Sequence, residues 1–198
     1  MAPTEARPQP RRRADAERSI ARIVAAARSS LSRDPDATVD EIALAAGVGR
    51  MTVYGHFRTR PELVEAALAE ALRVGEETLS AVDLTGDPRE ALARLLASSW
   101  SLVSESSALL AAAEKVLPEG RVRELHGSAA DRVEALLGRG QADGVFRTDL
   151  PMSWLVNVIQ HVLHGAAEEV RAGRLAEHEV ARVVTRTVLS MLTDRPAH

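Results

Sequence analysis

The chain has 198 residues, which is enough for one or two small domains that fold around their own hydrophobic cores without disulfide bonds. It contains no cysteine, so disulfides, thiolate zinc sites and cysteine nucleophiles are excluded. The formal net charge of −3 argues against nucleic-acid binding, but the charge is unevenly distributed. Residues 1–60 carry 11 basic and 7 acidic side chains, whereas residues 61–198 carry 14 and 21. A locally positive region attracts phosphate even where the whole chain is acidic.

The composition favours an all-helical protein. Hydrophobic residues make up 45% of the chain and aromatic residues only 3%, and the prevalent Ala, Leu, Val, Arg and Glu favour helix over sheet. We therefore expect an all-α fold of about nine helices. No apolar run approaches the roughly 20 residues that span a bilayer, and the N-terminus lacks an apolar signal core. A cytoplasmic protein without a membrane partner is expected.

The first 31 residues are expected to form a flexible arm followed by a helix. Residues 1–13 carry three prolines and four arginines without an apolar period, which predicts a disordered basic arm. The arm is either a solvated tail or an insertion into the minor groove of DNA. A helix is predicted over residues 14–31, where apolar side chains recur at helical spacing: Ile20, Ile23, Val24, Ala27 and Leu31.

Two short helices joined by a glycine turn come next. Thr38 is a suitable N-cap, and Glu41 three residues later completes a capping box. The first helix is predicted over residues 39–46 and ends at Gly47, which can adopt the left-handed conformation. The second is predicted over residues 49–56. This arrangement is the framework of a helix-turn-helix, which places its second helix in the major groove of DNA.

The two short helices have an inward and an outward face. The predicted packing face consists of Ile42, Ala43, Ala46, Val48, Val53 and Phe57. Arginine can donate two hydrogen bonds to guanine, and Thr, Tyr and His can donate to phosphate, so the outward residues of the second helix suit a DNA groove. These outward residues are Arg50, Met51, Thr52, Tyr54, Gly55 and His56.

The remaining helices are longer. Thr59 is expected to cap a helix over residues 60–79, with Pro61 in its first turn. Asp87 is expected to cap the next helix after the break at residues 83–88. Further helices are predicted over residues 87–104, 107–115, 118–138, 151–171 and 176–192. The chain thus divides into an arm (1–13), a helix-turn-helix DNA-binding domain (14–60) and a helical effector-binding and dimerisation domain (61–198).

The segment TVDEIALAAGVGRMTVYGHFRTRPELVEAAL, residues 38–68, resembles the TetR family of bacterial transcriptional regulators. The shared features are I-A-x-x-A-G-V, then T-V-Y-x-H-F, then a basic residue and a helix containing Leu63. The resemblance implies that base edges face Arg50, Met51 and Tyr54. It implies phosphate contacts from the backbone near Gly55 and from the side chains of Thr38, Thr52, His56 and Arg60. Many family members carry a larger residue at Gly55, so one contact is expected to be lost.

The last two predicted helices are expected to form a homodimer. Apolar residues occupy more than one face of residues 152–170. A second apolar stripe, on the next helix, consists of Val180, Val183, Val184, Val188 and Met191. A helix that is apolar on several faces must be buried on both sides. Two such helices from each subunit would give a four-helix interface, and a two-fold dimer matches a palindromic operator in double-stranded DNA.

The resemblance also implies a small-molecule effector that releases a repressor from its operator. Amphipathic residues on otherwise apolar helices suit such a pocket, and the candidates for ligand binding are Trp100, His126, Trp154, Asn157 and His161, with Gln160 and His164 nearby. Ligand and DNA binding would then be antagonistic and reciprocal.

Two alternative functions remain open. His161, His164 and Glu168 lie at spacings that could share a helix face, which allows a metal-responsive regulator. A helical interaction protein without specific DNA binding is the other. Neither a metalloprotease motif nor a Gly-rich phosphate loop is present in the sequence, so neither an enzyme nor a cofactor is expected.

Overall fold

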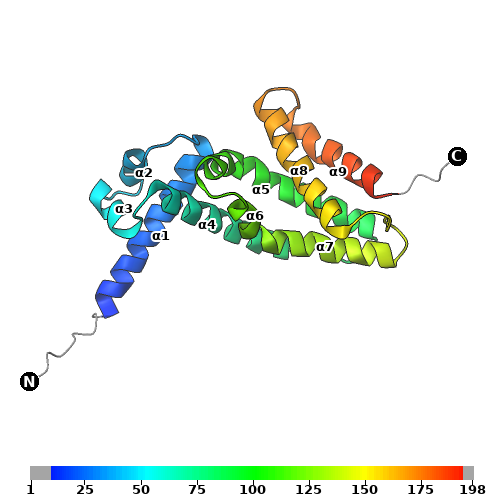
Figure 1. Cartoon of the computed structure of the whole chain (residues 1–198), viewed down its shortest axis with the longest axis horizontal. Helices are drawn as coiled ribbons and strands as arrows, with labels where there is room; N and C mark the ends of the chain where they lie inside the picture. The colour runs from blue at the N-terminus through cyan, green and yellow to red at the C-terminus, as the bar shows by residue number, and fades with distance from the viewer. Residues whose placement is uncertain (1–9, 194–198) are drawn as a thin grey trace, which may run out of the picture. The chain divides into compact units, whose positions relative to one another are not determined.

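The computed structural model describes residues 10–193, and within that part the chain forms nine helices and no strand (Figure 1). The expected all-α fold is confirmed. No helix in residues 10–193 is long and apolar enough to cross a membrane. The helices are α1 (Pro10–Arg33), α2 (Val39–Ala45), α3 (Arg50–His56), α4 (Arg60–Ser80), α5 (Pro88–Val116), α6 (Arg121–Leu125), α7 (Gly127–Ala142), α8 (Met152–Arg171) and α9 (Glu177–Leu192).

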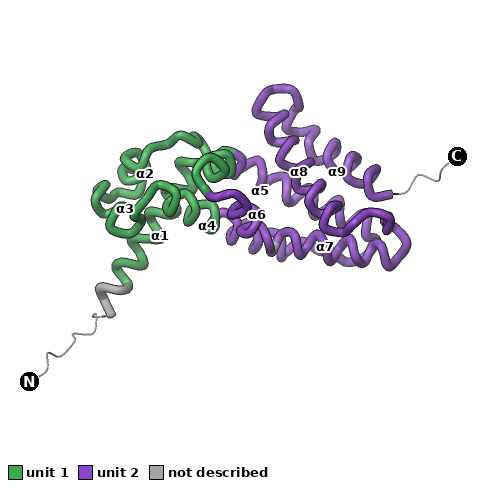
Figure 2. The backbone as a smooth tube through the Cα atoms, viewed as in Figure 1, with its two compact units in different colours: residues 1–70, 108–117 green, residues 71–107, 118–198 purple. Residues whose placement is uncertain are grey.

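The chain forms two compact units (Figure 2). Unit 1 contains the described residues up to Glu70 together with Ala108–Leu117. Unit 2 contains Ala71–Ser107 and the described residues from Pro118 onward. Unit 1 therefore extends ten residues beyond the predicted boundary at residue 60 and includes part of α5. Helices α4 and α5 each continue without a break from one unit into the other.

Unit 1 is built on apolar side chains from α1 to α5. Ile23, Ala27 and Leu31 of α1 are fully buried, as their spacing predicted. The first half of α4 contributes as much to the core as α1 does, which explains why the unit does not end at residue 60. The other fully or almost fully buried side chains of unit 1 are Ile42, Val53, Leu63, Val64, Ala67, Leu68, Leu109, Ala112 and Ala113.

The N-terminal arm is shorter than predicted. Helix α1 begins at Pro10, so the prediction of disorder is wrong for residues 10–13. Proline is compatible with the first turn of a helix because its missing N–H has no partner there. The rest of the predicted arm, residues 1–9, lies outside the described residues.

A break predicted in the middle of α5 is absent. The prediction of separate helices over residues 87–104 and 107–115 is wrong, because α5 runs without interruption from Pro88 to Val116. Two serine hydroxyls donate to carbonyls of the helix itself: Ser106 to Leu102 at 2.6 Å and Ser107 to Ser104 at 3.4 Å. Serine disfavours a helix only weakly, so burial of the flanking side chains decides the outcome.

The helix predicted from Pro118 is instead two helices. Gly120 adopts the left-handed conformation, with φ of 83°, so α6 begins only at Arg121. His126 separates α6 from α7. The predicted caps of α4 and α5 are confirmed: Thr59 Oγ1 accepts from the Glu62 N–H at 3.3 Å, and Asp87 Oδ1 accepts from the Arg89 N–H at 2.7 Å.

Unit 2 encloses the larger apolar core. It gathers buried side chains from α4, α5, α7, α8 and α9, including Leu92, Leu137, Leu155, Ile159 and Val184. Phe146, in the connection after α7, closes one part of this core and is almost completely buried. Its ring packs directly on Gly140 of α7, where an added Cβ would overlap the ring. The Val145 and Phe146 N–H groups donate to the Gly140 carbonyl at 2.8 and 3.1 Å, which fixes this approach.

We predict that Gly140→Ala destabilises the protein by about 1–3 kcal/mol, because the new methyl group forces the Phe146 ring out of its packed position. Gly138→Ala is the matched control on the same helix, because no described atom lies within 4 Å of its added Cβ. The control should stabilise by about 0.5–1 kcal/mol through the higher helix propensity of alanine. Urea unfolding of both variants measures the difference, and equal stabilities would show that Phe146 does not need Gly140.

Candidate nucleic-acid interface

The entry into α2 is fixed by a complete capping box. The Thr38 N–H donates to Glu41 Oε2 at 2.7 Å, and the Glu41 N–H donates to Thr38 Oγ1 at 3.2 Å. The Thr38 backbone, and then its hydroxyl, lower the pKa of the Glu41 carboxyl because both stabilise the charged form. The exit is fixed by Gly47, whose φ of 66° confirms the predicted left-handed turn.

The packing between α2 and α3 follows the predicted inward face. Ile42, Ala43 and Ala46 are buried, and Val53 is 1% exposed. Val53 is the only buried side chain of α3, so it anchors that helix. Phe57 is half-buried and less enclosed than an inward-facing aromatic was expected to be. The two short helices therefore form a rigid helix-turn-helix.

The outer surface of α3 carries the predicted groove-facing residues. Arg50, Met51, Thr52 and Gly55 are exposed, and Met51 is 80% exposed. Tyr54 and His56 are half-buried on the same short helix. The exposed residues provide hydrogen-bond donors for base edges and phosphates, as well as an apolar side chain suited to a thymine methyl group.

Arg50 is held on this surface by two partners. Its Nη1 donates to Asp40 Oδ2 at 2.6 Å, and its guanidinium carbon lies 5.4 Å from the centre of the Tyr54 ring. Both members of the ion pair are more than half exposed, so the pair adds little stability. Its effect is to orient Arg50. Asp40 was missed in the sequence because its partner lies ten residues away on another helix.

Thr38 and Arg60 already have structural roles. The Thr38 hydroxyl donates to Glu41 Oε2 at 2.8 Å within the capping box. The Arg60 guanidinium donates to the backbone carbonyls of Ala37 and Pro35, the latter at 3.2 Å. These bonds tie the start of α4 to the segment before α2. Because a guanidinium has five N–H donors, Arg60 retains capacity for a phosphate.

Gly55 lies on the exposed side of α3. No described atom lies within 4 Å of a Cβ added there, and Gly55 does not have a positive φ. The position therefore accommodates a side chain without distorting α3, and the glycine leaves one part of the surface bare.

Comparison with known proteins also identifies a DNA-binding helix-turn-helix in this part of the chain. Residues 23–67 match the family model of bacterial regulatory proteins, tetR family. Residues 23–67 therefore carry the DNA-binding region of the TetR family of bacterial transcriptional regulators. The match runs from α1 through the turn and α3 into α4, so it covers the surface described above. The chain is thus a DNA-binding transcriptional regulator.

Relatives and solved structures of the TetR family align with almost the whole chain. The transcriptional regulator NfxB of Pseudomonas aeruginosa is 27% identical over 175 residues, covering 85% of this chain and 91% of NfxB. The repressor LfrR of Mycolicibacterium smegmatis is 22% identical, covering 91% and 93%. The crystal structure of LfrR in complex with proflavine has a TM-score of 0.70, covering 90% of this chain and 98% of LfrR. The structure of a TetR-family regulator from Agrobacterium tumefaciens has a TM-score of 0.72 at 22% identity, covering 90% and 100%.

The five ligand candidates do not form one cluster. Trp100 is 8% exposed in the core of unit 2, whereas Trp154 is 55% exposed. Trp154, Asn157 and His161 share a face of α8 opposite its buried stripe, and His161 Nδ1 lies 2.8 Å from the Asn157 carbonyl. A pocket in unit 2 is lined by none of the five candidates.

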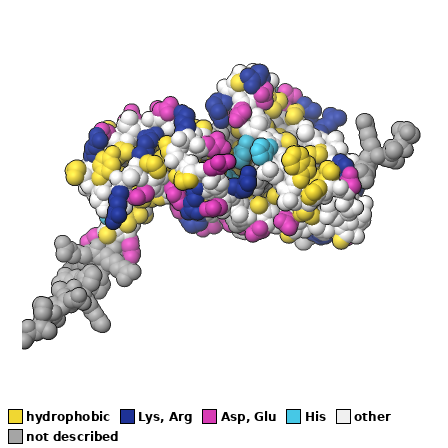
Figure 3. Space-filling view, in the orientation of Figure 1, with side chains coloured by type: hydrophobic (Ala, Val, Ile, Leu, Met, Phe, Trp, Pro, Cys, Tyr) yellow, Lys and Arg dark blue, Asp and Glu magenta, His cyan; other side chains and the backbone are white. Residues whose placement is uncertain are grey.

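His126 and His164 are brought together by the fold. Their rings meet edge to face with centroids 5.9 Å apart, and Figure 3 shows histidine side chains grouped on one face of the molecule. Burial, and then the nearby His126 and His161, lower the pKa of His164 to about 4. Within the described part of the chain, no three His, Asp or Glu side chains are grouped closely enough to hold a metal ion. The metal-responsive alternative therefore gains no support.

The low pKa of His164 predicts a loss of stability in acid. In the unfolded chain the His164 imidazole binds a proton near pH 6.5, whereas in the folded protein it stays neutral down to about pH 4. The contribution of His164 to the free energy of unfolding is therefore fully present above pH 6.5. As the pH falls toward 4, a contribution on the order of 2 kcal/mol is lost. Urea unfolding between pH 7 and 4 should show a shallower decline for His164→Gln than for the wild type. His178→Gln, at an exposed position in α9, should retain the wild-type decline, and parallel curves for all three proteins would contradict the prediction.

Proposed function

We propose that this regulator is a repressor that binds a palindromic operator as a homodimer and leaves it when a small molecule binds unit 2. The observation that carries the proposal is the exposed set of donors on α3, held on a helix-turn-helix by the burial of Val53. The ligand part is supported by the pocket in unit 2. LfrR, named as a repressor and crystallised with proflavine, is a relative with both properties.

We assign base recognition to the exposed Arg50 and Met51 and to the half-buried Tyr54 of α3. Arg50 exchanges its contact with Asp40 for a guanine edge, which costs little because the ion pair is exposed. Phosphate contacts come from the backbone near Gly55 and from the side chains of Thr38, Thr52, His56 and Arg60. Thr38 and Arg60 contact phosphate while keeping their structural bonds.

Dimerisation follows from the outer face of α8. Trp154 is 55% exposed, and Val158 and Val162 follow it one and two turns later, each half-buried in the single chain. Val183 and Met191 of α9 are also half-buried. Val162 and Met191 also pack against the core of unit 2, so Trp154, Val158 and Val183 are the apolar side chains that best suit a partner copy.

A gel-shift assay on the DNA that flanks the gene tests the DNA assignment. The wild type should bind one site with an affinity that falls steeply with salt. Arg50→Gln should weaken binding by about 1–3 kcal/mol and relax preference at one base pair in each half-site. Arg182→Gln on α9 is the control, because it removes the same charge outside unit 1. Binding that is blind to sequence, or an equal loss in both variants, would refute recognition by Arg50.

Oligomeric state tests the dimer face. Trp154→Glu should shift the protein from dimer to monomer in sedimentation velocity, since it places a charge in an apolar interface. Leu44→Glu is the matched control: Leu44 is 82% exposed on α2, so the same type of change should leave the dimer intact. A dimer that survives Trp154→Glu places the interface elsewhere.

A further inference from the structure

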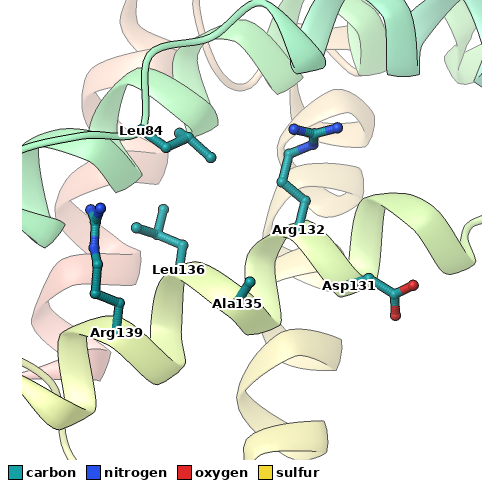
Figure 4. Close-up of a pocket in the computed structure, with 6 residues that line it drawn as sticks. All are labelled: Leu84, Asp131, Arg132, Ala135, Leu136 and Arg139. Atoms are coloured by element: carbon teal, nitrogen blue, oxygen red, sulfur yellow. The ribbon is translucent and has the colours of Figure 1, made fainter.

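A pocket of about 490 Å³ opens beside α7 in unit 2. Its lining consists of Leu84, Asp131, Arg132, Ala135, Leu136 and Arg139. Figure 4 shows Arg132 and Arg139 extending from α7 on either side of Leu136 toward the level of Leu84. The pocket thus has an apolar wall with an arginine at each end. Its volume lies in the range of small-molecule sites.

The guanidinium of Arg139 lacks hydrogen-bond partners on the edge formed by Nε and Nη2. Its Nε and Nη2 atoms are shielded from solvent and find no hydrogen-bond partner among the described residues. Buried N–H groups are normally satisfied, and a charged group without a partner is especially unfavourable. This edge therefore calls for an acceptor that the described part of the chain does not supply.

Two other arginines of unit 2 show what that edge binds. Arg147 donates from Nε and Nη2 to the two carboxylate oxygens of Asp149, at 2.7 and 2.6 Å. Arg174 binds Glu169 in the same two-pronged way, at 2.7 and 2.6 Å. A carboxylate matches the geometry of this fork. Arg139 presents the same pair of donors without the acid.

Among the charged side chains near the pocket, Arg139 is the one available to bind an anionic ligand. Arg132 already forms an ion pair with Glu76 of α4 through Nη2, so its Nε is the only buried nitrogen of that side chain without a partner among the described residues. The Thr85 hydroxyl and N–H both donate to Asp83 Oδ1 and are the main causes of the lowered pKa of Asp83, to which the charge of Arg139 adds. Asp131 also lines the pocket, and Figure 4 shows its carboxylate on the side of Arg132 that is remote from Arg139.

We propose that the pocket beside α7 binds an organic carboxylate with a short apolar tail, whose head group pairs with the Nε and Nη2 atoms of Arg139. The tail lies against Leu84, Ala135 and Leu136. The fork must turn toward the pocket to meet the ligand, and this rotation breaks no hydrogen bond at Nε or Nη2. That this carboxylate is the effector rests on the proposed ligand-controlled repression. That it binds the pocket does not depend on that proposal.

A head-group series on the unmodified protein tests the chemistry. Isothermal titration with octanoate, octanol and octylammonium compares an anion, a neutral molecule and a cation on the same apolar tail. Octanoate should bind with one site per chain, octanol at least tenfold more weakly, and octylammonium not at all. Equal binding of octanoate and octanol overturns the proposal.

Variants locate the site. Arg139→Gln should weaken octanoate at least tenfold and leave octanol unchanged, while Arg139→Lys should retain part of the affinity as a point charge. Arg171→Gln, an exposed arginine in the last turn of α8, is the control and should bind like the wild type. Unchanged octanoate binding in Arg139→Gln, with the fold verified by circular dichroism, overturns the assignment.

The operator-binding assay separates this site from the proposed function. Release of wild-type protein from DNA by octanoate, absent in Arg139→Gln, supports both. Arg139-dependent binding of octanoate that leaves DNA binding unchanged supports the site and refutes its role as the effector site. Release of DNA by octanoate in the Arg139→Gln variant refutes Arg139 as the anchor.

Discussion

The position of α3, whose exposed surface is proposed to contact DNA, depends on the burial of one valine. Helix α3 has seven residues, far fewer than the roughly 12–15 that an isolated helix needs to be stable in water. Its only buried side chain is Val53, which is 1% exposed. Packing on α2 therefore supplies the stability that the length of α3 cannot. The left-handed turn at Gly47 sets the direction in which α3 leaves α2, and the side-chain directions of Arg50 and Thr52 follow from these two constraints.

The polar residues around α2 and α4 support this arrangement and also lie where DNA contacts are proposed. Thr38 caps α2, and Arg60 ties the start of α4 to the carbonyls just before that cap. Substitution of either residue would change both the position of the helix-turn-helix and any contact with phosphate. A loss of DNA affinity in such a variant does not by itself identify a contact, whereas Arg50 and Met51 have no comparable structural role.

The sequence was sufficient to predict structural features that depend on neighbouring residues. The capping box at Thr38, the turn at Gly47 and the buried stripe of α1 depend on residues within one or two helical turns, and all three were predicted correctly. The prediction failed where tertiary packing overrides local preference. The serines near Ser106 weaken a helix only slightly, so flanking burial keeps α5 continuous. The left-handed conformation of Gly120 delays the helix predicted from Pro118, and a glycine alone does not reveal which conformation it adopts.

The two arginines central to the proposals differ in burial, and burial determines what each can do. Arg50 has a partner in Asp40, but both side chains are more than half exposed, so exchanging that partner for another acceptor changes the free energy little. This suits the proposed role of Arg50 in contacting a guanine edge. Arg139 is shielded from solvent on an edge without a partner, so an anion that satisfies it gains much more. Sequence alone could not separate these cases, because the difference lies in which acceptors the fold brings within reach of each guanidinium.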